Sequence, residues 1–165
     1  MNYNSVDEKY MKQALVLAEM GFEKGEVPIG AVLVDESSGS CISEAHNEIE
    51  ERNFAGAHAE VLAIQRGSEI IKNWRLKSMT LYVTLEPCPM CTSLAVLSRV
   101  RKIVYGCKDL RLGACGSLLN LAEHTNLPHR IIIEGGVLEK ECRDLIQSFF
   151  KLIREKNKFQ GKENL

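Results

Sequence analysis

The sequence has 165 residues, of which 45% are hydrophobic, and its formal net charge is −1 at pH 7. This length fits one compact domain whose core needs no disulfide bonds, and no apolar run approaches the roughly 20 residues that a membrane span requires. The near-neutral charge also excludes a basic field over the whole molecule, although residues 101–165 carry 12 Lys and Arg against 8 Asp and Glu. This local excess fits either a solvated helix face or a contact with a phosphate backbone.

The first half of the chain predicts a helix, a β-hairpin and a second helix. Apolar residues recur at helical spacing over residues 6–24. Residues 29–34 and 41–47 have the composition of two strands, and the serine- and glycine-containing turn between them makes a hairpin. Residues 48–56 are polar, so we expect a loop there, followed by a helix over residues 58–71.

The second half alternates strands with helices. In chain order we expect a strand at 80–84, a helix that begins at Pro87 or Pro89 and ends near Ser98, and a strand at 102–106. A glycine-containing loop at 107–117 and a short helix at 118–123 should follow. The chain then continues with a strand at 130–134 and a terminal helix from Leu138 to about Lys158. This alternation is typical of an α/β fold layered around one sheet, and the hairpin makes that sheet mixed.

The N-terminus and the cysteines bear on the compartment. Residues 1–8 have neither a basic nor an apolar region, so no secretory signal is indicated and a cytoplasmic location is expected. In that compartment a close pair of cysteines is more typical of metal binding or catalysis than of a disulfide. Only Cys88 and Cys91 form such a pair. No special role is assigned to the other four, which suit small core positions: Cys41, Cys107, Cys115 and Cys142.

Two short segments contain the residues of a metal site: His58-Ala59-Glu60 and Pro87-Cys88-Pro89-Met90-Cys91. Zinc binds imidazole nitrogen and thiolate sulfur in tetrahedral geometry, and one His with two Cys leaves the fourth position open to water, as in catalytic sites. Each segment lies at a predicted helix start, where thiolate is favoured and where α/β proteins place ligands beside the carboxyl ends of strands. We therefore predict that His58, Cys88 and Cys91 hold a catalytic zinc ion.

Glu60 lies early in an otherwise apolar helix, where a carboxylate is costly unless it has a partner or a function. Zinc lowers the pKa of a bound water to about 7, and a neighbouring carboxylate can then take up and deliver the proton. Taken singly, each feature has a plainer explanation, such as a surface histidine or a charge at a helix start. Together, H-x-E and P-C-x-x-C are the signature of zinc deaminases that act on cytosine or adenine.

The chain resembles the cytidine deaminase-like superfamily and, within it, the bacterial tRNA-specific adenosine deaminases, from about Asp7 to Lys156. The metal motifs carry the resemblance to the superfamily. The segments that carry the resemblance as a whole are 27–34, 58–60, 80–91, 113–118 and 149–150. The narrower resemblance is carried by Thr84-Leu85-Glu86 before the cysteine pair, by the Gly-Ser-Leu loop and by the terminal helix. It implies a three-layer α/β/α fold with a central mixed five-stranded sheet. It also implies a single zinc-dependent deaminase domain over residues 1–165, with its core at about 5–156 and a tail at 157–165.

The same resemblance implies the roles of individual residues. One zinc ion per subunit would be held by the three ligands already named, with Glu60 as the proton shuttle. Asn47 matches an asparagine that contacts the target nucleoside, and Asp109 lies in a loop that the family places beside the RNA. The implied reaction is hydrolytic deamination of adenosine to inosine at the wobble position (34) of tRNA anticodons by zinc-activated water. The implied partner is the anticodon stem-loop, bound by a homodimer, with no membrane involved.

Two other functions remain open at this point. A free nucleobase or nucleoside deaminase, acting on guanine, cytosine or cytidine, would use the same four residues, and only the basic terminal helix favours a polymer substrate. A non-catalytic RNA-binding partner subunit would keep the fold. Such a subunit typically lacks the glutamate or a ligand, whereas this chain has Glu60 and all three ligands.

Overall fold

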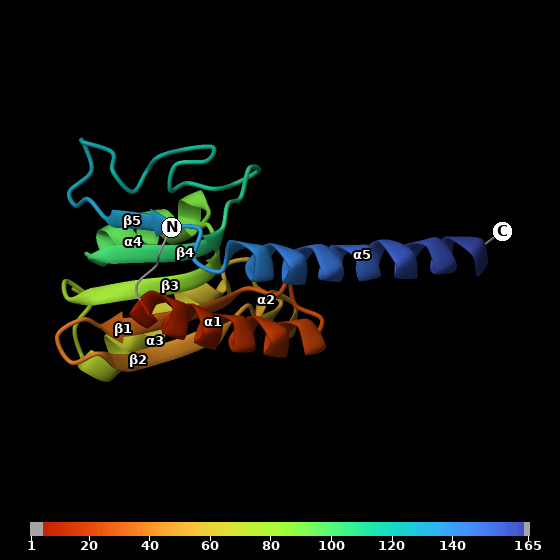
Figure 1. Cartoon of the computed structure of the whole chain (residues 1–165), viewed down its shortest axis with the longest axis horizontal. Coiled ribbons are helices and arrows are strands. Elements are labelled where there is room, and N and C mark those ends of the chain that lie inside the picture. The colour runs from red at the N-terminus through yellow and green to blue at the C-terminus, as the bar shows by residue number, and fades with distance from the viewer. Residues whose placement is uncertain (1–4, 164–165) are drawn as a thin grey trace.

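A five-stranded sheet runs through the computed structural model, which describes residues 5–163 and the side chains of residues 5–158 (Figure 1). The strands are β1 (Gly30–Asp35), β2 (Ser40–His46), β3 (Met79–Leu85), β4 (Lys102–Cys107) and β5 (Ile132–Gly135). The helices are α1 (Ser5–Glu23), α2 (Ile49–Arg52), α3 (Ala59–Ile71), α4 (Pro89–Leu97) and α5 (Glu139–Glu163). Each predicted strand and each predicted long helix begins within two residues of its observed start.

The direction of the strands explains where a site can form. The strand order is β2-β1-β3-β4-β5, in which β1 pairs antiparallel with β2 and β3, and β3, β4 and β5 are parallel. The predicted mixed sheet is therefore confirmed. Two antiparallel steps give β2 the same direction as β3 and β4, so the carboxyl ends of these three strands meet at one edge of the sheet. The segments that follow them, beginning at Asn47, Glu86 and Lys108, are brought together there.

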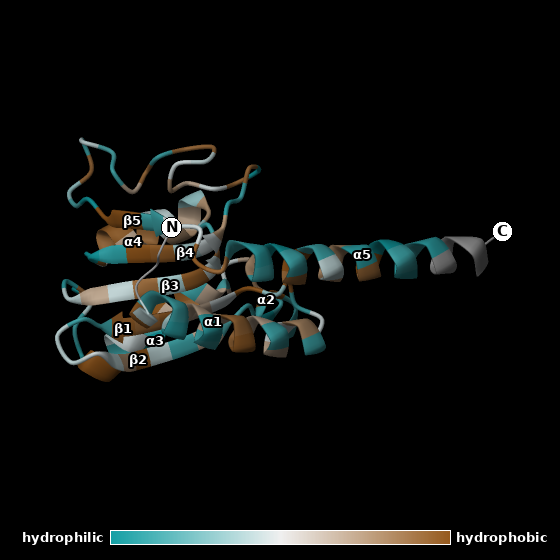
Figure 2. Ribbon diagram, in the orientation of Figure 1, coloured by the Kyte–Doolittle hydropathy of each residue, from teal (hydrophilic) through white to brown (hydrophobic). Residues whose placement is uncertain are grey.

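Two helical layers cover the sheet, with α1 and α5 on one face and α3 and α4 on the other (Figure 1). Successive side chains of a strand point to opposite faces. In β1, Ala31 and Leu33 accordingly join the core beneath α3 and α4, while Val32 and Val34 join the core beneath α1 and α5. β1 is buried on both faces and is apolar along most of its length (Figure 2). The predicted three-layer α/β/α architecture is confirmed.

Residues 48–56, predicted as a loop, include the single-turn helix α2. Its first backbone N–H groups need acceptors, and the Glu26 carboxylate supplies them by accepting from Ile49 N at 3.0 Å and Glu51 N at 2.9 Å. Glu26 is only 1% exposed and lies more than 20 residues upstream. The loop prediction was wrong because this helix depends on a distant acceptor rather than on a local pattern.

The short helix predicted at 118–123 is absent. The segment forms turns instead: Leu118 N and Leu119 N both donate to the Gly113 carbonyl, and Cys115 makes an isolated bridge with Asn120. Leu118 and Leu119 remain 54% and 45% exposed. A short helix is stable in a protein when it buries an apolar face, and these leucines stay largely exposed.

Helix α5 continues past the edge of the sheet and carries mainly hydrophilic residues (Figures 1 and 2). Its first turns are anchored by Cys142 and by Phe149, whose ring lies 5.4 Å from that of Phe22 in α1. It reaches Glu163 rather than ending near Lys158, so the predicted tail is helical as far as it is described. Residues 1–4 and 164–165, part of the expected single domain, lie outside the described residues. No helix within residues 5–163 has the length and apolar character to cross a membrane.

Candidate active site

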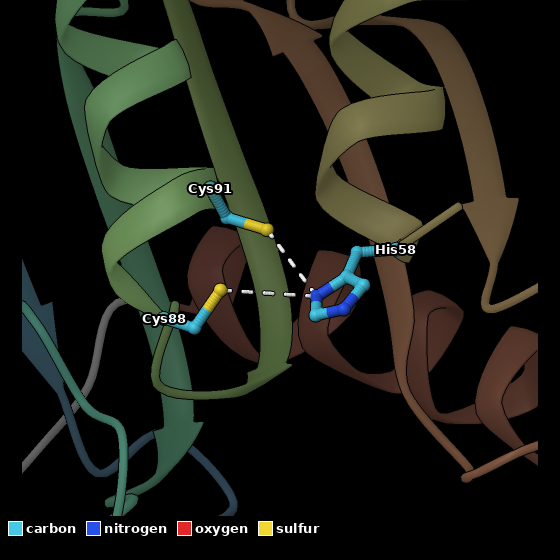
Figure 3. Close-up of side chains that lie close together, drawn as sticks. All are labelled: His58, Cys88 and Cys91. Atoms are coloured by element: carbon cyan, nitrogen blue, oxygen red, sulfur yellow. Dashed lines mark hydrogen bonds between the residues drawn. The ribbon is translucent and has the colours of Figure 1, made fainter. Parts of the chain in front are cut away.

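His58, Cys88 and Cys91 point toward one another from the starts of two helices (Figure 3). The Nδ1 atom of His58 lies 3.8 Å from the Sγ of Cys88 and 3.5 Å from the Sγ of Cys91. The three ligand atoms all lie within 4.8 Å of one another. Within residues 5–163, no other His, Cys, Asp or Glu side chains form such a group. The three residues that the sequence predicted as ligands are therefore brought together and could hold a metal ion.

The local backbone explains this convergence. His58 is the N-cap residue of α3, and Cys88 is the N-cap residue of α4. Both have extended backbone, and neither side chain makes a capping hydrogen bond, so each is free to turn toward the neighbouring helix. Pro89 occupies the first helical position, which its fixed φ suits, and Cys91 follows on the first turn.

The electrostatic environment of Cys88 and Cys91 favours a thiolate at one of the two sulfurs. A hydrogen bond with the Cys91 thiol, together with the His58 imidazole, lowers the pKa of the Cys88 thiol to about 4 against the effect of burial. The hydrogen bond to Cys88, with burial, raises the pKa of Cys91. Contact with Cys88 also raises the pKa of His58. These shifts favour the thiolate form of Cys88, which is the form that binds metals.

Glu60 lies on the first turn of α3 and is only 3% exposed. Its Oε2 atom is buried and has no hydrogen-bond partner within the described residues. Burial raises the pKa of this carboxyl, while the positive field of His58 opposes the rise. A buried carboxyl with an unpaired oxygen and a raised pKa is suited to holding and releasing a proton.

A cavity of about 510 Å³ opens over these residues, which is within the usual range of small-molecule sites. His58, Glu60 and Cys88 line it together with the apolar side chains of Val27 and Ile29. A large part of its wall comes from the loop after β4 and from α5: Lys108, Asp109, Arg111, Leu112, Arg143, Ile146, Gln147 and Phe150.

Asn47 borders this cavity directly after β2 and is 1% exposed. Its Oδ1 accepts a hydrogen bond of 2.9 Å from the backbone N–H of Ala59, the first residue of α3. This bond fixes the orientation of the amide and supports the helix turn that carries His58 and Glu60. No partner of Nδ2 is found within the described residues, so this donor is available at the cavity.

Asp109 also borders the cavity, but its carboxylate has a local task. Its Oδ1 accepts from Arg111 N at 2.8 Å and from Leu112 N at 3.2 Å, which closes the turn after β4. The structure thus places Asp109 at the edge of the cavity, in the loop after β4. In this arrangement, the Oδ1 atom of Asp109 holds the backbone of the loop through its two hydrogen bonds.

A family model of MafB19-like deaminases matches residues 5–153 of the chain. The chain is 47% identical over 152 residues to a tRNA-specific adenosine deaminase of Bacillus subtilis (strain 168), with 92% of this chain and 93% of the relative covered. This chain belongs to the tRNA-specific adenosine deaminase family. A relative of the same name in Haemophilus influenzae is 40% identical over 154 residues, which cover 93% of this chain and 88% of that protein.

The fold of this deaminase is similar to that of a solved structure from work on A-to-I editing by tRNA:A34 deaminases at the wobble position of transfer RNA. The two have a TM-score of 0.79 and 36% sequence identity, over 83% of this chain and 98% of that one. The predicted cytidine deaminase-like fold is therefore confirmed.

Sequence reasoning missed Glu86 and the contribution of α5 to the cavity of this deaminase. Glu86 is 1% exposed and is surrounded by hydrogen-bond donors from the loop after β4. An acidic residue placed between a buried strand and a metal motif was the available signal. Arg143, Gln147 and Phe150 gave no local signal, because they reach the cavity only through the packing of α5.

The remaining cysteines divide by burial. Cys107, Cys115 and Cys142 are buried, as expected for small core residues, and burial raises the pKa of Cys107 to about 11 and that of Cys115 to about 12. Cys41 is exposed, so the core position expected for it was wrong. None of these four is placed in the ligand group.

Proposed function

We propose that this chain converts adenosine to inosine at the wobble position of tRNA anticodons by hydrolysis. The observation that carries the proposal is the buried, unpaired carboxyl of Glu60 beside an open three-ligand metal group, in a chain of this deaminase family. In the reaction, water adds at C6 of the adenine ring and ammonia leaves, so that adenosine and water give inosine and ammonia.

The ligand group fits zinc. Sulfur and nitrogen ligands of a tetrahedral zinc ion lie about 3.5 Å apart. The two sulfur–nitrogen distances of 3.8 and 3.5 Å are close to this value. We propose that His58, Cys88 and Cys91 bind one zinc ion per chain. When bound, zinc would lower the pKa of a water molecule enough for it to act as a nucleophile near pH 7.

Glu60 is proposed to carry the protons of the reaction. Its carboxyl would take one proton from the attacking water and deliver it to N1 of adenine, and would then take the second proton from the oxygen now bound to C6 and deliver it to the departing amine. Both transfers need a group that changes protonation readily at neutral pH. The desolvated position of Glu60 supplies such a group, since burial raises the pKa of its carboxyl toward that range.

Asn47 is proposed to orient the target nucleoside through its Nδ2 donor, while its Oδ1 holds the first turn of α3. Asn47→Asp keeps the acceptor and loses the donor, so we expect KM for an anticodon stem-loop to rise about tenfold or more with zinc content unchanged. Steady-state inosine formation and metal analysis would check this.

Asn73→Asp is the matched control for the Asn47 variant. Asn73 is exposed, and its Oδ1 accepts from Arg75 N at 3.0 Å, so the same replacement is made in the same kind of contact outside the cavity. We expect it to leave KM unchanged. Wild-type KM in the Asn47→Asp protein would contradict the role of Asn47.

The surroundings of the cavity favour a polymer over a free base. A second cavity shares Arg111, Ile146, Gln147 and Phe150 with the first and continues to Lys151 and Arg154 on α5. Cations along a groove that leads away from a base-sized cavity suit a phosphate backbone. We propose that the anticodon stem-loop follows this groove, with the loop that Asp109 closes beside it.

The test of the proposed function is mass analysis for inosine after incubation with total tRNA. Parallel assays would use an anticodon stem-loop, adenosine, guanine, cytosine and cytidine as substrates. We expect inosine at the wobble position of the stem-loop. Ammonia release from a free base or nucleoside, with none from the stem-loop, would instead support the free-base deaminase. Bound zinc without inosine in any tRNA would support a non-catalytic subunit.

We further propose that the chain acts as a homodimer in the cytoplasm. The dimer is an expectation from the family resemblance, and exposed apolar side chains on the α4 side, Met90 at 43% and Leu97 at 60%, support it as surface that a second copy could cover. Light scattering that gives the mass of a single chain at micromolar concentration would contradict the dimer.

A further inference from the structure

Glu86 lies at the junction between β3 and the metal motif, two residues before Cys88. Its Oε1 accepts from Cys115 N and from Ser117 N, each at 3.0 Å. Its Oε2 accepts from Asp109 N at 3.1 Å and from the Ser117 hydroxyl. One buried carboxylate therefore accepts four hydrogen bonds, and all four come from residues 109–117.

The chemistry of these contacts requires a carboxylate. An ionised carboxylate accepts at about four positions and donates at none, and here every position faces a donor. Three of the four donors are backbone N–H groups, which cannot turn away. A buried N–H that loses its acceptor has a high free-energy cost, so this carboxylate strongly favours one arrangement of the segment.

Gly113 gives independent evidence for the same close contact. A Cβ atom at this position would lie 2.4 Å from the Asp109 carbonyl oxygen and 2.5 Å from the carboxyl group of Glu86. In addition, Ala114 N donates to the Pro87 carbonyl at 2.9 Å. The segment is thus held directly against the turn that leads into Cys88, and only a glycine fits between them.

The held segment is also part of the cavity wall, because Asp109, Arg111 and Leu112 line the cavity. Glu86 itself borders the cavity, but it is 1% exposed and both of its oxygens are occupied by donors of this segment, so its effect on a substrate passes through this wall. We propose that Glu86 is a positioning residue that fixes segment 109–117 as the wall of the cavity and thereby sets how tightly RNA binds. This inference rests on the proposed function.

The test is Glu86→Gln, which keeps the size of the side chain but directs an NH₂ group at N–H or O–H donors. We expect KM for an anticodon stem-loop to rise about tenfold or more, kcat to change less than about threefold, and zinc content to stay at the wild-type level. Hydrogen exchange should show lost protection at the amides of Asp109, Cys115 and Ser117. A rise in KM with little change in kcat distinguishes a displaced cavity wall from a general loss of stability.

Asp7→Asn is the matched control. Asp7 is a 5% exposed carboxylate of α1 that accepts from the Tyr82 hydroxyl at 2.8 Å on the other face of the sheet. Its replacement should lower stability without changing KM. If Glu86→Gln does not fold, Ser117→Ala removes one of the four contacts and should raise KM about threefold. Unchanged KM in that variant would overturn the inference.

Wild-type KM in folded Glu86→Gln would also overturn the inference, as would loss of zinc with a fall in kcat alone. Failure of the proposed function looks different, because the wild-type chain would then form no inosine. Hydrogen exchange of the Glu86→Gln protein still tests the positioning role in that case. Loss of amide protection confined to residues 109–117 supports the role, and protection equal to that of the wild type overturns it.

Discussion

Glu60→Gln is expected to abolish inosine formation, by about a thousandfold or more, while the zinc content stays at the wild-type level. Glutamine has nearly the same size and fits the 3% exposed position, but it cannot take up or release a proton at neutral pH. Because the glutamate lies outside the ligand group, metal binding should not depend on it. Single-turnover formation of inosine in a stem-loop, together with metal analysis, would measure both effects.

Glu69→Gln is the matched control for this loss. Glu69 lies on the same helix, α3, but on its solvent side, where its carboxylate accepts from Gln65 Nε2 at 3.1 Å. We expect its replacement to leave the rate unchanged. A Glu60→Gln protein that keeps a sizeable fraction of wild-type turnover would remove Glu60 from the proposed role.

Cys91→Ala is expected to lower bound zinc to less than about a tenth of an ion per chain and to reduce inosine formation about a thousandfold or more. Only three side chains form the ligand group, so losing one leaves two, which is too few for a stable site. Cys91 is buried on the first turn of α4, and among the side chains of residues 5–158 no other cysteine lies in the ligand group to replace it.

Cys41→Ser serves as the control for thiol loss, since Cys41 is exposed and lies outside the ligand group. This variant should keep both zinc and activity. The same measurements on protein stripped of metal with a chelator and reloaded with zinc should show loss and recovery of turnover. A Cys91→Ala protein that still holds one zinc per chain would show that the ligands were assigned wrongly.

The place of the site follows from strand direction. Asn47, Glu86 and Asp109 belong to segments that follow β2, β3 and β4, and these three strands end at the same edge of the sheet. α/β proteins usually bind ligands at such an edge, because helix starts and loops converge there. The proposed catalytic, binding and positioning residues are thus separated in the sequence but share one structural origin.

Much of this could be predicted from the sequence because it depends on local patterns. Short apolar runs of strand composition placed β1 and β3, helical periodicity placed α1 and α3, and Pro87 or Pro89 marked the start of α4. The pairing of H-x-E with P-C-x-x-C indicated the ligands and Glu60, since few other functions need these residue types at two helix starts. Two local predictions failed, the loop at 48–56 and the helix at 118–123. The helix within 48–56 depends on the carboxylate of Glu26, more than 20 residues upstream, whereas residues 118–121 form turns against residues 113–116 and leave Leu118 and Leu119 exposed.

The sequence by itself therefore predicted the layered fold, the three candidate ligands and the residue beside them that is proposed to carry a proton. These features depend on the spacing and type of residues that lie close together in the sequence. Only the tertiary structure decided that the ligand atoms lie within 4.8 Å of one another, that α5 helps to close the cavity, and that Glu86 holds segment 109–117. Such facts depend on contacts between segments 20 to 100 residues apart, where the packing of the whole chain decides which groups meet.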